Sequence, residues 1–152
     1  MSAIAARLSE LGLTLPPVAA PVAAYVPAVQ SGKQIITSGQ LPFVNGELTT
    51  VGKVGDTVSL EEAQAAAATC VLNAIAAVGA LVDLDDIVKI VRLGVFVASD
   101  PEFTAQPAVA NGASELIGQI FGEAGAHARA AVGVAALPMD ACVEVELIAE
   151  VR

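Results

Sequence analysis

The sequence predicts an α+β fold of two layers, in which a mixed β-sheet carries two helices on one face. Segments typical of strands and helices follow one another in the order β-β-α-β-α-β-β. The predicted helix at residues 60–82 is apolar around most of its circumference, which favours a position against a sheet. With 152 residues, the chain fits a single domain, residues 1–152, that buries roughly two-thirds of its unfolded surface.

The first 20 residues predict a short helix and a proline-rich lead-in. Residues 2–11 have helical character. Proline fixes φ and lacks an amide proton, so the four prolines that follow prevent a long helix: Pro16, Pro17, Pro21 and Pro27. We therefore expect an extended segment that lies along the body of the domain.

The first two strands are predicted as a hairpin around Asn45-Gly46. Extended runs flank this dipeptide within residues 33–55. Both residues tolerate the positive φ of a type I′ turn, which makes Asn-Gly a strong hairpin signal.

Both predicted helices have recognisable ends. Ser59 followed by Glu62 is the capping-box pattern, which satisfies two amides at the start of the helix at 60–82. The second helix covers residues 106–121, and Gly122 and Gly125 stop it.

Three strands complete the sheet, at residues 87–99, 128–137 and 141–151. A tight link at 138–140 joins the last two, which we expect to pair as a hairpin. On that pairing Arg129 lies near Glu150 rather than Glu144 within one chain. Whether another subunit brings Arg129 to Glu144 stays open.

Composition and charge narrow the possible functions. The net charge of −9, one Tyr, four Phe and no Trp argue against nucleic-acid binding. No uninterrupted apolar stretch approaches the ~20 residues of a membrane span. Arg7 and Glu10 interrupt what would be a signal core, so we expect a cytoplasmic protein. Because 55% of the residues are hydrophobic, three sheets packed around a common axis could bury the uncovered sheet face.

Cysteine and histidine do not predict a metal centre. Cys70, Cys142 and His127 lack the number and spacing of zinc ligands, and the two cysteines are expected to be buried, unpaired thiols. His127 is either a general base or a solvated loop residue.

A few other residues are candidates for a binding site. Arg129 stands alone in the apolar run "GAHARAAVGVAALP", where it is either a surface charge or a functional cation. Gly39, within the strand segment "TSGQLP", leaves room for a ligand or another backbone and exposes amide donors. Tyr25 is the only tyrosine. On the last strand, Glu146 and Glu150 fit a solvated face, whereas Glu144 lies nearer the turn.

These segments together resemble the Rid family, the reactive intermediate deaminases also called YjgF-like or L-PSP proteins, from about residue 20 onward. The resemblance rests on the order of Tyr25, "SGQLP", Asn73, "IVKIVRLGVF", Asn111, "HARAAVGVAALP" and "VEVELIAEV". The chain is most similar to a divergent, YjgF-like branch. In place of the family's proline before the Ala-Arg pair stands His127, and Ala130 and Ala131 replace a small polar residue and a cysteine.

The resemblance implies a chorismate-mutase-like fold in a homotrimer, with clefts between subunits. It implies hydrolysis of imines and enamines, such as 2-iminopropionate and 2-aminoacrylate, to 2-keto acids and ammonia, without metal or organic cofactor. By the same resemblance Arg129 binds the substrate carboxylate, Glu144 lies near the attacking water, and Tyr25, Gly39 and Asn111 line the cleft. A non-catalytic protein that binds or senses small carboxylates is the alternative, and an endoribonuclease fits the charge poorly.

Overall fold

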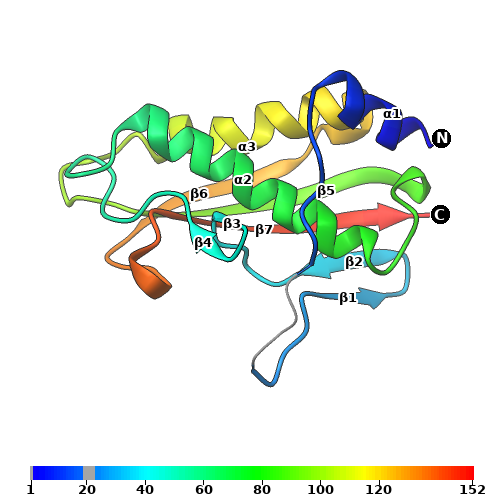
Figure 1. Ribbon diagram of the computed structural model, residues 1–152, viewed down its shortest axis with the longest axis horizontal. Helices are drawn as coiled ribbons and strands as arrows, with labels where there is room; N and C mark the ends of the chain where they lie inside the picture. The colour runs from blue at the N-terminus through cyan, green and yellow to red at the C-terminus, as the bar shows by residue number, and fades with distance from the viewer. Residues whose placement is uncertain (1, 19–22) are drawn as a thin grey trace.

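A computed structural model describes residues 2–18 and 23–152, and Figure 1 shows a sheet with its long helices on one side. The five strands lie in the order β1 (Ala28–Ser31), β2 (Gln34–Thr37), β7 (Val143–Val151), β5 (Ile87–Ala98) and β6 (Ala128–Val134). Helices α2 (Leu60–Gly79) and α3 (Gln106–Phe121) cover one face. The predicted α+β architecture with a mixed sheet is therefore confirmed. Pro21 lies outside the described residues.

Helix α2 begins at the predicted capping box. The Ser59 hydroxyl accepts from the Glu62 amide at 3.1 Å, and the Glu62 carboxylate accepts from the Ser59 amide at 3.1 Å. By length and composition α2 could cross a membrane, with a mean hydropathy of 1.2. In this fold it is the central core helix, since its apolar side chains are buried against the sheet and α3. It ends three residues before the predicted boundary at 82.

The predicted hairpin between the last two strands is wrong. Strand β6 runs parallel to β5, and β7 pairs antiparallel with β5 on the other side. The reason is the crossover through α3, because a strand, a helix and a following strand in one sheet normally form a parallel unit. Arg129 therefore does not lie beside Glu150. Strand β5 separates the two residues, and Glu150 pairs with Gln34 of β2 and Lys89 of β5.

The Asn45-Gly46 turn forms where predicted, but the hairpin around it is small. Asn45 and Gly46 have φ values of 52° and 81° and connect β3 (Phe43–Val44) to β4 (Glu47–Leu48). The first two strands of the main sheet come earlier, on either side of Gly32, whose φ is 59°. The prediction that the first two sheet strands flank Asn45-Gly46 is therefore wrong.

The sheet has two different faces. Alternate residues of β7, beginning with Val143, are buried against the helices. Its other side chains are only half-buried and include Glu144, Glu146 and Ile148. We call this second face, opposite α2 and α3, the open face (Figure 1).

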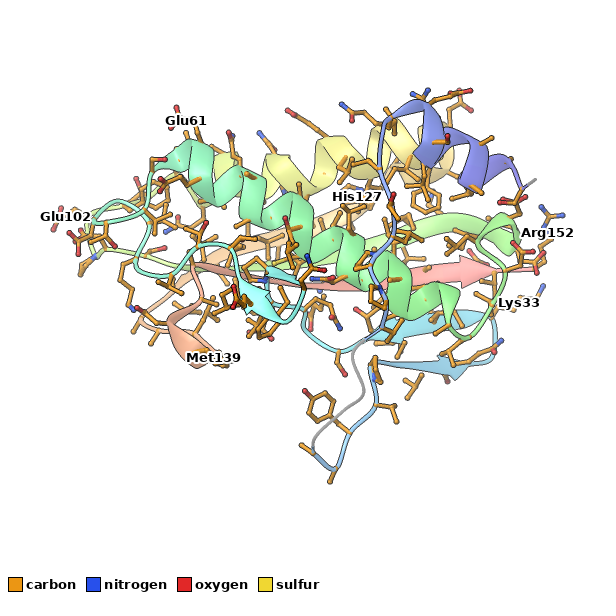
Figure 2. All side chains as sticks on the ribbon, viewed as in Figure 1. Lys33, Glu61, Glu102, His127, Met139 and Arg152 are labelled. Carbon is orange, nitrogen blue, oxygen red and sulfur yellow. The ribbon has the colours of Figure 1, made fainter. Side chains whose placement is uncertain are left out.

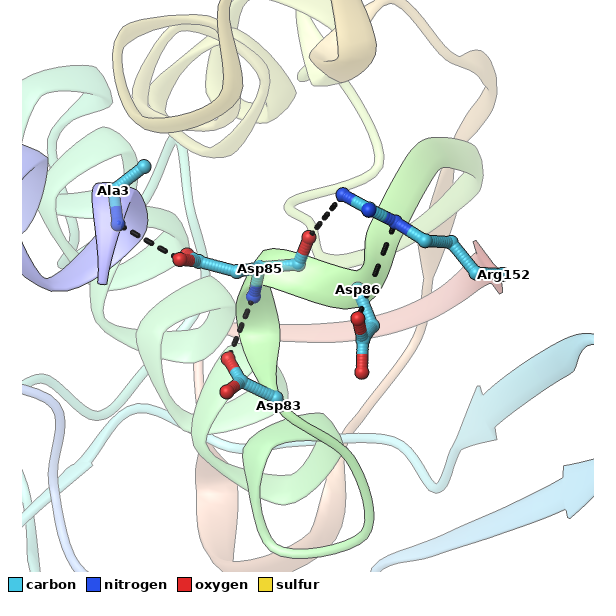
Figure 3. A network of polar contacts seen from close by, with 5 residues as sticks. All are labelled: Ala3, Asp83, Asp85, Asp86 and Arg152. Carbon is cyan, nitrogen blue, oxygen red and sulfur yellow. Dashed lines mark hydrogen bonds and ion pairs between the residues drawn. The ribbon is translucent and has the colours of Figure 1, made fainter.

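Helix α1 (Ala3–Glu10) is fastened to the start of β5 by a carboxylate (Figure 3). Asp85 accepts from the amides of Ala3 at 2.8 Å and Ile4 at 2.9 Å. These two bonds, from Ile4 first and then Ala3, hold the pKa of Asp85 below its ordinary value. At the other end of α1, Arg7 donates to the Gln119 carbonyl of α3 at 2.7 Å.

Candidate functional site

Arg129 lies near the start of β6, and its side chain extends to α3. Its Nη1 donates to Asn111 Oδ1 at 2.8 Å and to Ser114 Oγ at 3.1 Å. Its Nη2 donates to the Pro107 carbonyl at 3.4 Å. Pro107, Asn111 and Ser114 recur every three or four residues, so one side of α3 supplies all three acceptors. The structure thus brings together Arg129 and Asn111, two of the predicted site residues.

The three acceptors of Arg129 are all neutral. No carboxylate in the described part of the chain lies within ion-pair distance of it, and its guanidinium is exposed. Of its five N–H groups, Nη1 commits two and Nη2 commits one. Nε–H and one Nη2–H remain, and these atoms share one edge of the planar group. Such an edge matches the two oxygens of a carboxylate.

His127 is neither a free loop residue nor aimed at open solvent. Its Nδ1 lies 2.6 Å from the Gly125 carbonyl, and its Nε2 lies 2.9 Å from Ser114 Oγ. Figure 2 labels His127 beneath α3. A carbonyl can only accept, so Nδ1 carries a proton, and Nε2 and the Ser114 hydroxyl share the second hydrogen bond. Both ring nitrogens are therefore committed within the chain.

Gly39 and Glu144 form a second cluster, on the open face. A Cβ at Gly39 would overlap Glu144 Oε1. The space that the missing side chain leaves is therefore filled by a carboxylate of the same chain and not by a ligand. Gly39 also lies beyond the end of β2 rather than within a strand. The bonds that hold this loop run from Asn73 Nδ2 to the carbonyls of Leu41 at 3.0 Å and Phe43 at 3.1 Å.

Glu144 differs from its neighbour Glu146. Burial raises the pKa of Glu144, and the nearby charge of Glu146 raises it further. Glu146 forms a partly exposed ion pair with Arg92, with its Oε1 3.2 Å from Arg92 Nη1. Glu144 has no such cation among the described residues. A half-buried carboxyl with a raised pKa is suited to accepting and returning a proton.

The two clusters lie on opposite faces of the sheet. Arg129 is in register with Leu93 of β5 and through it with Leu147 of β7, which is buried on the helix side. Glu144 belongs to the alternate set of β7 and points to the open face. Within one chain, Arg129 and Glu144 therefore cannot act on the same bound molecule.

Tyr25 joins neither cluster. Its side chain is 58% exposed, and it precedes β1. The neighbouring backbone is tied to the loop of Gly39, because Ser38 Oγ donates to the Val26 carbonyl at 2.6 Å.

The cysteines are buried and free, as predicted. Burial raises the pKa of Cys142 to about 11 and that of Cys70 well above its ordinary value, so neither is a ready thiolate. The described residues hold no group of three or more His, Cys, Asp or Glu side chains that could bind a metal ion.

Ser114 contacts both Arg129 and His127 and was not among the predicted site residues. A signal was present in the sequence, because Ser114 follows Asn111 by three residues and so shares its face of the helix. Asn73 is part of the family resemblance, and its role in fastening the Gly39 loop becomes visible only in the structure.

Comparisons with known proteins establish the family. Residues 5–151 match the family model described as "YjgF/chorismate_mutase-like, putative endoribonuclease", and the chain belongs to this family. It is similar to Protein TCP17 of Trypanosoma cruzi, with 49% identity over 98% of this chain and 94% of that protein.

Two solved structures show where in the family the chain falls. The Agrobacterium tumefaciens protein Atu1372, of unknown function, is 46% identical with a TM-score of 0.90, over 98% of this chain and 92% of that one. Escherichia coli TdcF, solved with bound serine, is 29% identical with a TM-score of 0.59, over 91% and 94%. The chain is thus a divergent YjgF-like protein.

Proposed function

We propose that the protein hydrolyses small 2-imino acids and their enamine tautomers, such as 2-iminopropionate and 2-aminoacrylate, to 2-keto acids and ammonia. One observation carries the proposal: Arg129 is held by neutral acceptors while one edge of its guanidinium stays free for a carboxylate. The serine bound to TdcF, a small amino acid with a carboxylate, is a ligand of the same chemical kind.

The proposed reaction asks little of the protein. Water adds to the electrophilic carbon of the C=N bond, and the resulting carbinolamine loses ammonia as the C=O bond forms. Arg129 anchors the carboxylate next to the reacting carbon. The raised pKa of Glu144 suits it to take a proton from the water and return it to the departing nitrogen. The proposed reaction uses no metal or organic cofactor.

The proposal requires more than one copy of the chain, because Arg129 and Glu144 lie on opposite sheet faces. We place the cleft in a homotrimer, with Arg129 and Asn111 from one subunit and Gly39 and Glu144 from its neighbour. Tyr25 then completes the cleft from its exposed loop. Apolar side chains on the open face favour such burial: Val29, Ile36, Phe96, Val132 and Ile148. A single domain acting in the cytoplasm is part of the same proposal.

The test is competition for an imine formed in solution. An amino-acid oxidase generates a panel of 2-imino acids, and semicarbazide traps whatever imine survives. We expect the protein to lower the yield of semicarbazone and raise that of free ammonia and keto acid. Unchanged trapping across the panel would refute deaminase activity.

A second function is binding of keto acids without turnover. The observation that favours it is the separation of the two clusters. The free edge of the Arg129 guanidinium can bind a carboxylate without any contribution from Glu144. This reading predicts that pyruvate binds and that the trap yield stays unchanged.

A further inference from the structure

The contacts that hold Arg129 continue beyond the residues that a ligand would touch. The Gly125 carbonyl, the His127 ring, the Ser114 hydroxyl and the Arg129 guanidinium form one unbroken chain of hydrogen bonds. We propose that Ser114 and His127 are positioning residues, which hold the Nε/Nη2 edge of Arg129 in place to receive a carboxylate. This inference rests on the proposed carboxylate site.

When the His127 ring is neutral, the hydrogen bonds of this chain all follow one direction. The Gly125 carbonyl accepts from His127 Nδ1, which leaves Nε2 as the acceptor for the Ser114 O–H. The oxygen of Ser114 then turns a lone pair to Arg129 Nη1, 3.1 Å away. His127 acts on the anchor only through this hydroxyl.

The far end of the chain is fixed by packing. Gly125 is buried, and a Cβ on it would lie 2.8 Å from the Ile117 carbonyl and 3.1 Å from that residue's Cγ2. The backbone therefore sits tightly against α3 where it presents its carbonyl to His127. The relay begins at a rigid point and ends at an exposed side chain.

Two acceptors on Nη1 do what one could not. Without Ser114, Asn111 would be the single acceptor of Nη1, and the 3.4 Å bond from Nη2 to the Pro107 carbonyl would be the other restraint on the guanidinium. Ser114 is a second point on the same nitrogen, and together the two set the plane of the group. A long, exposed arginine otherwise loses rotamer freedom when it binds a ligand, and a pre-ordered one has already lost it.

The experiment is a chemical-shift titration of the full-length protein with pyruvate, which measures weak binding as well as strong. Ser114→Ala and His127→Phe should each raise the Kd about 2- to 10-fold, the range expected when one long side chain loses its pre-ordering. Ser114→Thr, which keeps the hydroxyl, should restore affinity. Thr69→Val is the control, since the hydroxyl of Thr69 bonds only within its own helix, to the Ala65 carbonyl.

A double variant separates positioning from a general structural effect. If Ser114 acts through Arg129, Ser114→Ala should weaken binding no further in an Arg129→Ala background. Multiplying effects would overturn the proposal, as would unchanged affinity of Ser114→Ala or a failure of Ser114→Thr to restore binding. Pyruvate binding that is absent in the unmodified protein, or unaffected by Arg129→Ala, would instead refute the carboxylate site itself.

Discussion

Arg129 and Glu144 lie in contrasting surroundings. Arg129 is on the edge strand, on the helix side, and its own chain fills three of its five N–H groups and leaves one edge free. Glu144 is on the open face and is pressed against Gly39, whose missing side chain gives it room. The Arg129 guanidinium is thus hydrogen-bonded by its own chain and exposed to solvent on one edge. The Glu144 carboxyl is crowded and partly desolvated. The proposed function therefore needs two copies of the chain to bring these two groups into one site.

The largest expected effect comes from removing the Arg129 side chain. Arg129→Ala should reduce imine turnover about 30- to 1,000-fold, because a charge-assisted bidentate contact is worth on the order of 2 to 4 kcal/mol. Arg129→Lys should recover only part of it, since lysine lacks the planar fork. Steady-state kinetics measure both.

Arg152→Ala is the matched control, because it removes the same charge from an exposed position at the end of the chain. If Arg129→Ala unfolds the protein or dissociates its assembly while Arg152→Ala does not, Arg129 is structural.

The close contact between Gly39 and Glu144 predicts the next effect. Gly39→Ala should lower the free energy of unfolding by about 1 kcal/mol, since its Cβ would overlap the Glu144 carboxylate, which lies at the end of a flexible side chain and must move. Thermal or denaturant unfolding measures the loss, and the double variant Gly39→Ala, Glu144→Ala should regain most of it. Gly118→Ala is the control, because nothing lies within 4 Å of the Cβ it would add. Equal stability losses in the two alanine variants would contradict the crowding.

The raised pKa of Glu144 predicts a pH-dependent stability. Folding favours the protonated carboxyl, so its contribution is full below the ordinary glutamate pKa of about 4.3 and is lost as pH rises through the folded pKa. Glu144→Gln mimics the protonated form. The variant should therefore melt at a higher temperature than the unmodified protein at pH 7 and at the same temperature at pH 4. An advantage that persists at pH 4 would contradict the assignment.

The smallest effect is expected far from both clusters. Asp85→Ala should speed hydrogen exchange at the Ala3 and Ile4 amides and leave imine turnover unchanged. The pKa of Asp85 is lowered in the fold, so its contribution is present above the ordinary aspartate pKa of about 3.9 and is lost as pH falls through the folded value. In the unmodified protein, the protection factors of these amides, which correct for the pH dependence of intrinsic exchange, should fall in acid in the same way. A fall in turnover would mean that α1 supports the site.

Local signals predicted the helices well, and long-range pairing was the weak point. Ser59 and Glu62 form the predicted cap, and α3 begins and ends where its flanking residues indicated. The partner of β6 could not be found in this way, because a short link between two strands is compatible with a hairpin or with a crossing to the other side of β5. That choice depends on how α3 packs, which no local pattern states.

The candidate site was predictable in part for the same reason. The resemblance assigned Arg129, Glu144, Tyr25, Gly39 and Asn111 to one cleft, and within one chain the structure brings Arg129 to Asn111 and Gly39 to Glu144. The face on which each side chain points follows from strand register, which the sequence does not give. The role proposed for His127 likewise depends on its contact with Ser114 of α3, which the sequence does not show.

The most direct test of a shared site is complementation between two damaged chains. Arg129→Ala and Glu144→Gln are each expected to be nearly inactive, and they are co-expressed with different affinity tags so that mixed assemblies can be purified. If each cleft takes Arg129 from one subunit and Glu144 from its neighbour, every mixed trimer keeps one intact cleft of its three, and imine turnover of the purified mixed assemblies should return to about a third. Mixed assemblies that stay as inactive as either variant alone would contradict a site built from two chains.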